Sequence, residues 1–274
     1  MTEREIPVHA QLSGVPETAL WTLRNRAEEA LRADSGFADA EAVRLYRRLG
    51  GEDFERFGPP SQVHALRAQV IDTVIAEFLG SHPGAPVVAL GEGLQTTYWR
   101  LGEPESAWYS IELPEMIDAQ ERLLPAAPGI TRLAYSALDR QWLEKVPSGP
   151  AVITAEGLFM YLPTADVHAL IADLAAHFPG GVLVYDSIPR LFSAMTRTGR
   201  VRLSDRYTAP PMPTSQSPRQ ARRLPGRIPG VVAAQDLLPP RGRGRWGSPV
   251  LRWAADTPIG HALRPSITLL RFAQ

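Results

Sequence analysis

The chain has 274 residues, enough for one large domain with a substantial core or for two small domains, and we expect one. Its 29 basic and 29 acidic residues cancel, so the overall charge favours neither nucleic acid nor a membrane as a partner. The absence of cysteine excludes disulfides, thiolate zinc sites and a cysteine nucleophile, and the scattered histidines suggest no metal site. Without a signal-peptide pattern or a long apolar run, the chain is predicted to be cytoplasmic.

The first part of the chain is predicted to be a helical cap. Apolar residues recur at helical spacing over residues 16–31 and again over 61–79, and a shorter helix is expected over 41–49. The sequence "GSHPGAP" at residues 80–86 then collects helix-breaking residues. We therefore place the end of the cap at residue 80 and expect a sheet to follow.

Short apolar runs separated by helix-like segments come next. They predict strands at residues 87–90, 107–113, 130–134, 151–155 and 181–186. Strands that alternate with helices indicate an α/β fold, with a mostly parallel, doubly wound, Rossmann-like sheet covered by helices on both faces. Two later runs are expected to complete a seven-stranded sheet, and they cover residues 231–238 and 266–272.

The predicted division of the chain follows these patterns. It consists of a cap at 1–80, a core at 81–190, a lid rich in proline and arginine at 191–247, and a segment at 248–274 that completes the sheet. Asp205 and Asp236 are the only acids of the lid. Its arginines include Arg200, Arg202, Arg206, Arg219, Arg222, Arg223, Arg227, Arg241, Arg243 and Arg245. A solvated flap and a surface for an acidic acceptor, or for an acidic carrier protein that delivers one, both fit this composition.

The sequence "VVALGEGLQT" runs a predicted strand directly into Gly91 and Gly93. Ligands of parallel α/β sheets bind beyond the carboxyl ends of the strands, and glycine permits both a positive φ and the close approach of a ligand. Glu112 ends the next predicted strand, where a carboxylate can accept hydrogen bonds from the two ribose hydroxyls of a nucleoside. The alternatives without a ligand are a plain tight turn and a solvated strand end.

Two cofactors fit a glycine turn followed by a ribose carboxylate: a dinucleotide and S-adenosylmethionine. A dinucleotide site has a third glycine where the pyrophosphate meets the start of a helix, and Thr96 occupies that position here. The pattern therefore favours the methyl donor, with an NAD(P)-dependent oxidoreductase as the alternative function.

Several segments also resemble a known family. "GVPETALWTLRNRAEEA", "ALRAQVID", "VVALGEGLQTTYWRL", "WYSIELPEMIDAQERLLP" and "AEGLFMYLP" have the order and spacing of the leucine carboxyl methyltransferase-like family of class I S-adenosylmethionine enzymes. The resemblance extends over about residues 13–190 and is greatest to the bacterial branch that O-methylates polyketides, the tetracenomycin carboxyl methyltransferase type. It implies an O-methyltransferase that acts on a carboxyl or hydroxyl group of an aromatic or polyketide-type small molecule and releases S-adenosylhomocysteine.

The resemblance also implies which residues bind the donor. They are Arg67, Gly91, Glu92, Gly93, Glu112, Leu113, Leu138, Asp139, Glu156 and Gly157. Arg67 matches the arginine that pairs with the carboxylate of the methionine moiety, and Glu156 matches an acid near its ammonium group. Glu112 replaces the usual aspartate at the ribose. In the adenine segment the chain departs from the common Asp-Leu pair, so Asp139 either substitutes for that acid or caps the next helix.

The acceptor side is less defined. Tyr161 is a candidate wall or hydrogen-bond donor, and the first helix, with Trp21, Asn25 and Arg26, is expected to close the pocket. A carboxylate acceptor is already ionised at neutral pH and needs no general base, whereas a phenol needs one, and no histidine is assigned to that work. A non-catalytic donor-binding relative and a methyltransferase for protein C-terminal leucine are further alternatives.

Overall fold

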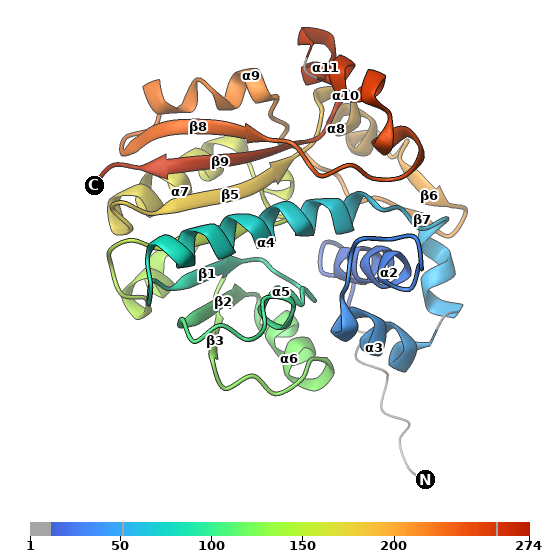
Figure 1. Cartoon of the computed structure of the whole chain (residues 1–274), viewed down its shortest axis with the longest axis horizontal. Coiled ribbons are helices and arrows are strands. Elements are labelled where there is room, and N and C mark those ends of the chain that lie inside the picture. Colours follow the sequence, from blue (N-terminus) through green and yellow to red (C-terminus); the bar gives the residue numbers. More distant parts are fainter. Residues whose placement is uncertain (1–11, 51, 256) are drawn as a thin grey trace.

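The computed structural model describes residues 12–50, 52–255 and 257–274. Its centre is a seven-stranded sheet with the order β3-β2-β1-β4-β5-β9-β8 (Figure 1). The strands are β1 (Val87–Leu90), β2 (Trp108–Glu112), β3 (Ile130–Ala134), β4 (Val152–Ala155), β5 (Val182–Ser187), β8 (Val231–Leu237) and β9 (Ser266–Phe272). The first five are parallel, and β9 is antiparallel to both of its neighbours. The predicted α/β fold and its seven strands are confirmed.

Helices cover both faces of the sheet, which explains the uninterrupted apolar strands. Alternate residues of β1 point to opposite faces, so Val88 packs with α7 (Thr164–His177) on one face and Val87 with α4 (Val63–Ser81) on the other. Every residue of β1, β4 and β5 is buried. Further elements of this half are α5 (Thr97–Arg100), α6 (Pro114–Leu123), η2 (Arg140–Lys145) and η3 (Phe159–Tyr161).

The N-terminal elements form two different associations. α2 (Thr18–Ala30), α3 (Ala40–Leu49) and the 3-10 helix η1 (Glu52–Phe57) pack together around Leu20, Leu23 and Leu45. By contrast, α4 lies across the sheet and buries its apolar side against β1, β4 and β5. The predicted division at residue 80 therefore falls at the end of a helix that belongs to the core of the sheet.

The region after β5 contains more regular structure than its composition predicts. Its elements are α8 (Arg190–Arg197), β6 (Arg202–Ser204), β7 (Tyr207–Thr208), α9 (Pro218–Ala221), η4 (Leu224–Gly226), η5 (Gly244–Gly247), α10 (Pro249–Ala255) and α11 (Pro258–Leu263). Each is only two to eight residues long, too short to show periodicity in a sequence. Proline begins three of the helices, because its fixed φ suits the first helical position.

No helix in the described ranges is both long and apolar enough to cross a bilayer. The carboxyl ends of β1, β2, β4 and β5 share one edge of the sheet, because these strands are parallel. The N-terminal helices α2 and α3 lie on the side of the molecule to which this edge points (Figure 1). The loops at the edge, and the helices above them, contain the predicted site.

Candidate functional site

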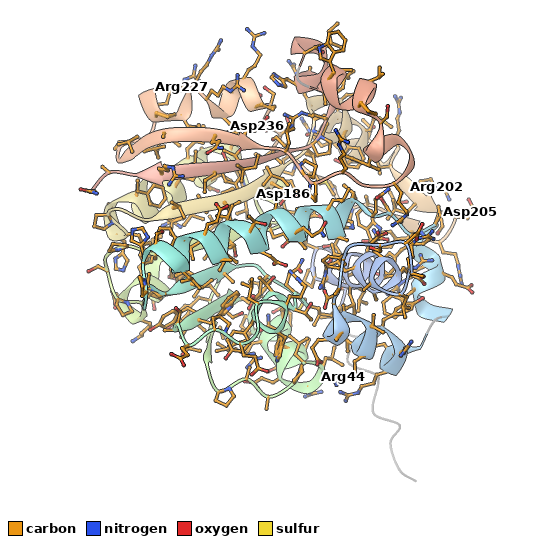
Figure 2. The ribbon with its side chains drawn as sticks, in the orientation of Figure 1. Arg44, Asp186, Arg202, Asp205, Arg227 and Asp236 are labelled. Carbon is orange, nitrogen blue, oxygen red and sulfur yellow. The ribbon has the colours of Figure 1, made fainter. Side chains whose placement is uncertain are left out.

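Acidic residues and glycines gather where the four strands end. Gly91 follows β1, Glu112 ends β2 and Glu156 follows β4. Asp186, labelled in Figure 2, is the penultimate residue of β5. Opposite them, α4 supplies Arg67. The parallel sheet thus brings together residues that are separated by more than ninety positions in the sequence.

Arg67 is held between two carboxylates. Its Nε and Nη2 lie 2.9 and 2.8 Å from Oε1 of Glu156, and its Nη1 lies 2.7 Å from Oδ2 of Asp186. Burial lowers the pKa of Arg67, but the charges of Asp186 and Glu156 outweigh this effect and raise the pKa above its usual value. The two hydrogen bonds use the Nε–H group and one N–H group of Nη1, so N–H groups on both terminal nitrogens are left for a ligand carboxylate.

Glu156 and Gln95 leave acceptor atoms beside this guanidinium. Glu156 Oε1 accepts hydrogen bonds from Gln95 Nε2, at 2.8 Å, and from Arg67 Nε. Among the described residues, no donor bonds to the other oxygen, Oε2. Gln95 Oε1 is buried and has no hydrogen-bond partner within the described part of the chain. A buried acceptor without a donor is costly, so a cationic N–H group bound here would be stabilised by both side chains.

Asp186 was not predicted as a site residue. Its Oδ1 accepts a hydrogen bond from the backbone N–H of Gly157 at 2.6 Å while Oδ2 pairs with Arg67. It therefore joins the loop after β4 to the guanidinium. The signal in the sequence was an acid at the end of "GVLVYD", since the end of β5 lies next to the end of β4.

Three glycines give the loops their path. Gly91, Gly93 and Gly157 have φ of 59°, 58° and 69°, a region that strongly favours glycine. A Cβ on Gly91 would lie 2.8 Å from Leu158 Cδ1, and one on Gly157 would lie 3.5 Å from both Nη atoms of Arg67. The glycines therefore let these loops adopt their turns and pass close to Leu158 and to the Arg67 guanidinium, where a side chain would not fit or would crowd it.

Glu112 faces the same loop. Its Oε1 accepts from the Gly93 N–H at 3.1 Å and its Oε2 from the Leu113 N–H at 2.8 Å. Burial raises the pKa of Glu112 to about 7. Burial also raises the pKa of Glu92 to about 7, and the charge of Glu112 adds to this increase. Leu113 exposes 38% of its surface at the end of β2. The carboxylate thus supports the loop, and contact with a ribose remains a prediction.

The segment expected to bind adenine follows β3. Asp139 caps η2, because its Oδ1 accepts from the Gln141 N–H at 3.0 Å, and Leu138 packs against the core beneath the sheet. The capping role considered for Asp139 is therefore present. A contact of Asp139 or Leu138 with adenine stays a prediction.

The predicted acceptor side contains aromatic rings and neutral polar groups. The rings of Trp21 and His64 meet edge to face at 5.0 Å. Asn25 accepts from the Ser61 N–H at 3.0 Å, which turns its Nδ2 toward His64 Nδ1 at 2.7 Å. His64 Nδ1 must then accept, so the neutral imidazole carries its proton on Nε2. Burial, followed by the charges of Arg67 and Arg26, lowers the pKa of His64 well below 6.5.

Tyr161 stands near the same charges. Burial raises the pKa of the Tyr161 hydroxyl to about 12, which a hydrogen bond with Thr18 and the charge of Arg67 partly oppose. The hydroxyl is therefore protonated at neutral pH and is a hydrogen-bond donor.

Arg26 is placed differently from the prediction. It is fully buried, with Nη1 at 2.6 Å from both Asp39 Oδ2 and Thr96 Oγ1 and Nη2 at 2.7 Å from the Leu94 carbonyl oxygen. Arg26 therefore ties α2 to the loop after β1 instead of lining an acceptor pocket. The reason is Asp39, the N-cap of α3, whose carboxylate needs a cation at that depth.

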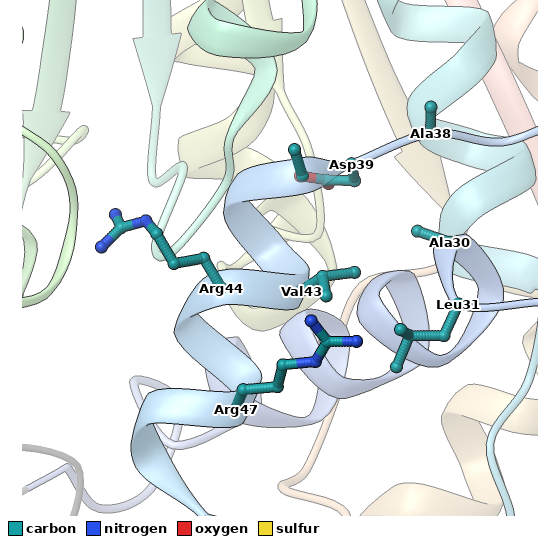
Figure 3. Close-up of a pocket in the computed structure, with 8 residues that line it drawn as sticks. Ala30, Leu31, Ala38, Asp39, Val43, Arg44 and Arg47 are labelled. Atoms are coloured by element: carbon teal, nitrogen blue, oxygen red, sulfur yellow. The ribbon is translucent and has the colours of Figure 1, made fainter.

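A surface cavity of about 520 Å³ lies behind this network, between α2 and α3 (Figure 3). Its lining includes Leu31, Val43 and Arg47, together with Asp39. It contains none of the predicted donor-binding residues.

Comparisons with known proteins agree with this architecture. An O-methyltransferase family protein of Burkholderia thailandensis has a TM-score of 0.50 at 15% identity, over 94% of this chain and 70% of that one. The CurJ carbon methyltransferase has a TM-score of 0.56 at 12% identity, over 95% of this chain and 67% of that one. The fold is that of the class I methyltransferases.

The sequence comparisons identify the family. Residues 20–175, more than half of the chain, match the model of the leucine carboxyl methyltransferase family. The chain is 32% identical over 183 residues to the tetracenomycin polyketide synthesis O-methyltransferase TcmP of Streptomyces glaucescens, covering 65% of this chain and 67% of TcmP. A putative S-adenosyl-L-methionine-dependent methyltransferase of Streptomyces coelicolor is 28% identical over 199 residues, 63% of this chain and 66% of that protein.

The chain belongs to the leucine carboxyl methyltransferase family. It is an S-adenosylmethionine-dependent methyltransferase, as predicted, and the oxidoreductase alternative is set aside. Thr96 agrees with this assignment, because its hydroxyl is committed to Asp39 and Arg26 at the position where a dinucleotide loop has its third glycine.

Proposed function

We propose that the chain transfers the methyl group of S-adenosylmethionine to a carboxylate oxygen of an aromatic or polyketide-type small acid. The observation that supports a carboxylate over a phenol is the state of the titratable groups around Arg67. Each is a neutral hydrogen-bond donor or is already paired with a cation.

The residues of the site fit the donor. The remaining N–H groups of Arg67 suit its carboxylate, and the vacant acceptors on Glu156 and Gln95 suit its ammonium group. Gly91 and Gly93 allow the backbone to approach, and we assign Glu112, at the end of β2, to the ribose hydroxyls. When bound, the donor supplies an electrophilic methyl group on a sulfonium.

Removal of a phenol proton would need a base, and the described residues near Arg67 offer none. His64 uses its Nδ1 lone pair on Asn25 and carries a proton on Nε2. Tyr161 has a pKa of about 12. Glu156 and Asp186 are both in ion pairs with Arg67, so protonating either one would weaken a buried salt bridge.

A carboxylate acceptor is ionised at neutral pH, so the chain has only to hold and orient it. The Tyr161 hydroxyl and His64 Nε2–H are the donors that we assign to the second acceptor oxygen. Trp21 supplies an apolar wall that excludes water from the reacting atoms. The printed role of TcmP in polyketide synthesis supports an acceptor of the polyketide type.

Paired substrates test the proposal directly. The full chain is incubated with S-adenosylmethionine and either 2-naphthoic acid or 2-naphthol, and mass spectrometry follows the gain of one methyl group. We expect the methyl ester and no ether, at a rate that, with saturating donor, does not rise with the ionisation of a base. Arg67→Ala is the inactive control. Methylation of the phenol in preference to the acid would contradict the proposal.

A further inference from the structure

Three short helices beyond the sheet expose apolar side chains. α11 contacts both α8 and α10, and the three lie together at one corner of the molecule (Figure 1). Each carries two large apolar residues three or four positions apart, hence on one side of its helix. These residues, which we call the apolar face, are Leu191, Met195, Val250, Trp253, Ile259 and Leu263. They are six of the eleven exposed large apolar residues in the described ranges.

The side chains of the apolar face protrude into water. Trp253 and Ile259 are each 73% exposed, Val250 is 70% exposed and Leu191 is 60% exposed. Single exposed apolar residues are normal on protein surfaces, but a contiguous group marks a surface that binds something. The exposed fractions indicate a partner that surrounds each side chain.

Exposed arginines border this face. Arg190 and Arg197 are the first and last residues of α8, and Arg219, Arg222 and Arg223 lie on or directly after α9, which contacts α11. None of these five is in an ion pair with another described residue. The sequences of α8, α9, α10 and α11 contain no acidic residue, and Asp256 is the one acid in the sequence between α10 and α11. These charges and apolar residues together favour a partner that is both apolar and anionic.

A bilayer with anionic lipids meets both requirements. Trp, Ile, Leu and Val enter the boundary between headgroups and acyl chains, while arginines bind the lipid phosphates. A second copy of the chain would bring an equally basic border against the first, which repels it. An acidic protein would need a separate depression for each protruding side chain, whereas a bilayer adapts to any of them. We propose that the apolar face and its arginine border bind the surface of anionic bilayers.

The excess of arginines around the apolar face is local, and the net charge of the whole chain is zero. For this reason the composition predicted no membrane partner. The contact is with the bilayer surface, and no segment has to span it.

The apolar face also lies at the edge of the sheet that contains the donor site. Ser187 at the end of β5 pairs with Ser266 at the start of β9, α8 begins three residues after Ser187, and α11 ends three residues before Ser266.

Because the apolar face lies near the donor site, binding to a bilayer would serve methyl transfer. This benefit rests on the proposed function, whereas lipid binding itself does not. An aromatic acid with a large apolar body partitions into bilayers. A chain that binds there with its site close to the surface meets such an acceptor at a raised local concentration.

Flotation with vesicles tests the proposal on the full chain. The probes are vesicles of phosphatidylcholine alone and of equal parts phosphatidylcholine and phosphatidylglycerol. We expect the chain to float with the anionic vesicles, to stay behind with the neutral ones, and to be released as salt is added. The triple variant Arg219→Ala, Arg222→Ala, Arg223→Ala should partition about 100-fold more weakly, since each arginine near an anionic surface contributes about fivefold.

Apolar variants and matched controls complete the test. The double variant Trp253→Ala, Ile259→Ala should lose at least about tenfold in partition. Arg122→Ala on α6 and Val232→Ala on β8, both exposed and outside the apolar face, should bind as the unaltered chain does. Circular dichroism shows that each variant is folded, and methyl transfer without vesicles is measured separately, so a failure of lipid binding and a failure of the proposed reaction can be told apart.

Three results would overturn the proposal. The first is an absence of flotation with anionic vesicles at low salt. The second is an equal loss in the controls and in the variants of the face. The third is sedimentation equilibrium that shows a dimer which Trp253→Ala dissociates, because a second copy would then cover the face. A monomer that binds no vesicle would leave an acidic protein as the partner and would refute binding to lipid.

Discussion

Arg67 of the donor site and the arginines on and after α9 have the same side chain but differ in burial and in ion-pair partners. Arg67 exposes 11% of its side chain and has two carboxylates in contact, whereas Arg219, Arg222 and Arg223 are exposed and have none. A buried, doubly paired guanidinium is fixed in one orientation and suits one small anion. Exposed guanidiniums without partners can rearrange over a large anionic surface. The same residue type thus serves selective binding in one region and broad attraction in the other.

The largest effect is expected from Arg67→Ala. It leaves Glu156 and Asp186 buried without their cation, which should lower the free energy of unfolding by about 3–5 kcal/mol and weaken donor binding by at least about 100-fold. Urea unfolding and calorimetric titration with S-adenosylhomocysteine measure the two changes. Arg219→Ala, the exposed counterpart, should change neither quantity. Donor affinity within threefold of the unaltered chain would remove Arg67 from the donor site.

Asp39→Asn should produce the next largest change. Asp39 is fully buried between Arg26 and Arg100, and the neutral amide would leave both cations under-compensated, at about 3 kcal/mol of stability. Because Thr96 also bonds to Asp39, the loop after β1 should loosen and donor affinity should fall. Asp34→Asn is the matched control, since Asp34 is an exposed acid nearby. Equal melting temperatures for the two variants would contradict the assigned role.

Glu112 should make donor affinity depend on pH. In the folded chain its pKa is about 7 rather than 4.5, so between these values the folded state binds more protons than the unfolded state. The stability of the donor-free chain therefore falls as pH rises through this window. Ribose hydroxyls donate to the ionised carboxylate, so affinity should rise about tenfold from about pH 6 to about pH 8.

Glu112→Gln should flatten this dependence and leave only the part that Glu92 contributes. Calorimetric titration with S-adenosylhomocysteine across the pH range measures the slope for both chains. A slope that is the same in both would show that Glu112 does not face the ribose.

Tyr161→Phe should have the smallest effect. A hydroxyl with a pKa of about 12 does not act as a base, so its removal should lower kcat by less than about tenfold and leave the shape of the pH–rate profile unchanged. Steady-state kinetics with an aromatic acid measure both. A loss of several orders of magnitude, or the disappearance of a basic limb in the profile, would assign Tyr161 to proton transfer.

The features that could be predicted from the sequence are those encoded locally. Each strand ending in glycine or an acid, such as β1 before Gly91 and β4 before Glu156, is a short continuous pattern, and parallel strands always bring such ends to one edge. The choice of Arg67 came from a family motif and agrees with its position beside Glu156.

The features that could not be predicted depend on distant partners. Asp186 lies 119 positions from Arg67, and only the pairing of β4 with β5 brings them together. Helical periodicity does not show which charged residue of α2 is buried. Arg26 is the one that pairs with Asp39, and only the packing of α2 against α3 determines this. The apolar face was missed because α10 and α11 have seven and six residues, fewer than a periodic pattern needs.

A crystal structure of the chain with S-adenosylhomocysteine tests the central claim most directly. We predict that the carboxylate of the product accepts hydrogen bonds from the terminal nitrogens of Arg67, with its ammonium group at Glu156 and Gln95 and its ribose at Glu112. A product molecule bound away from the carboxyl ends of β1 and β4, or bound there with Arg67 still turned to its two carboxylates alone, would contradict the account.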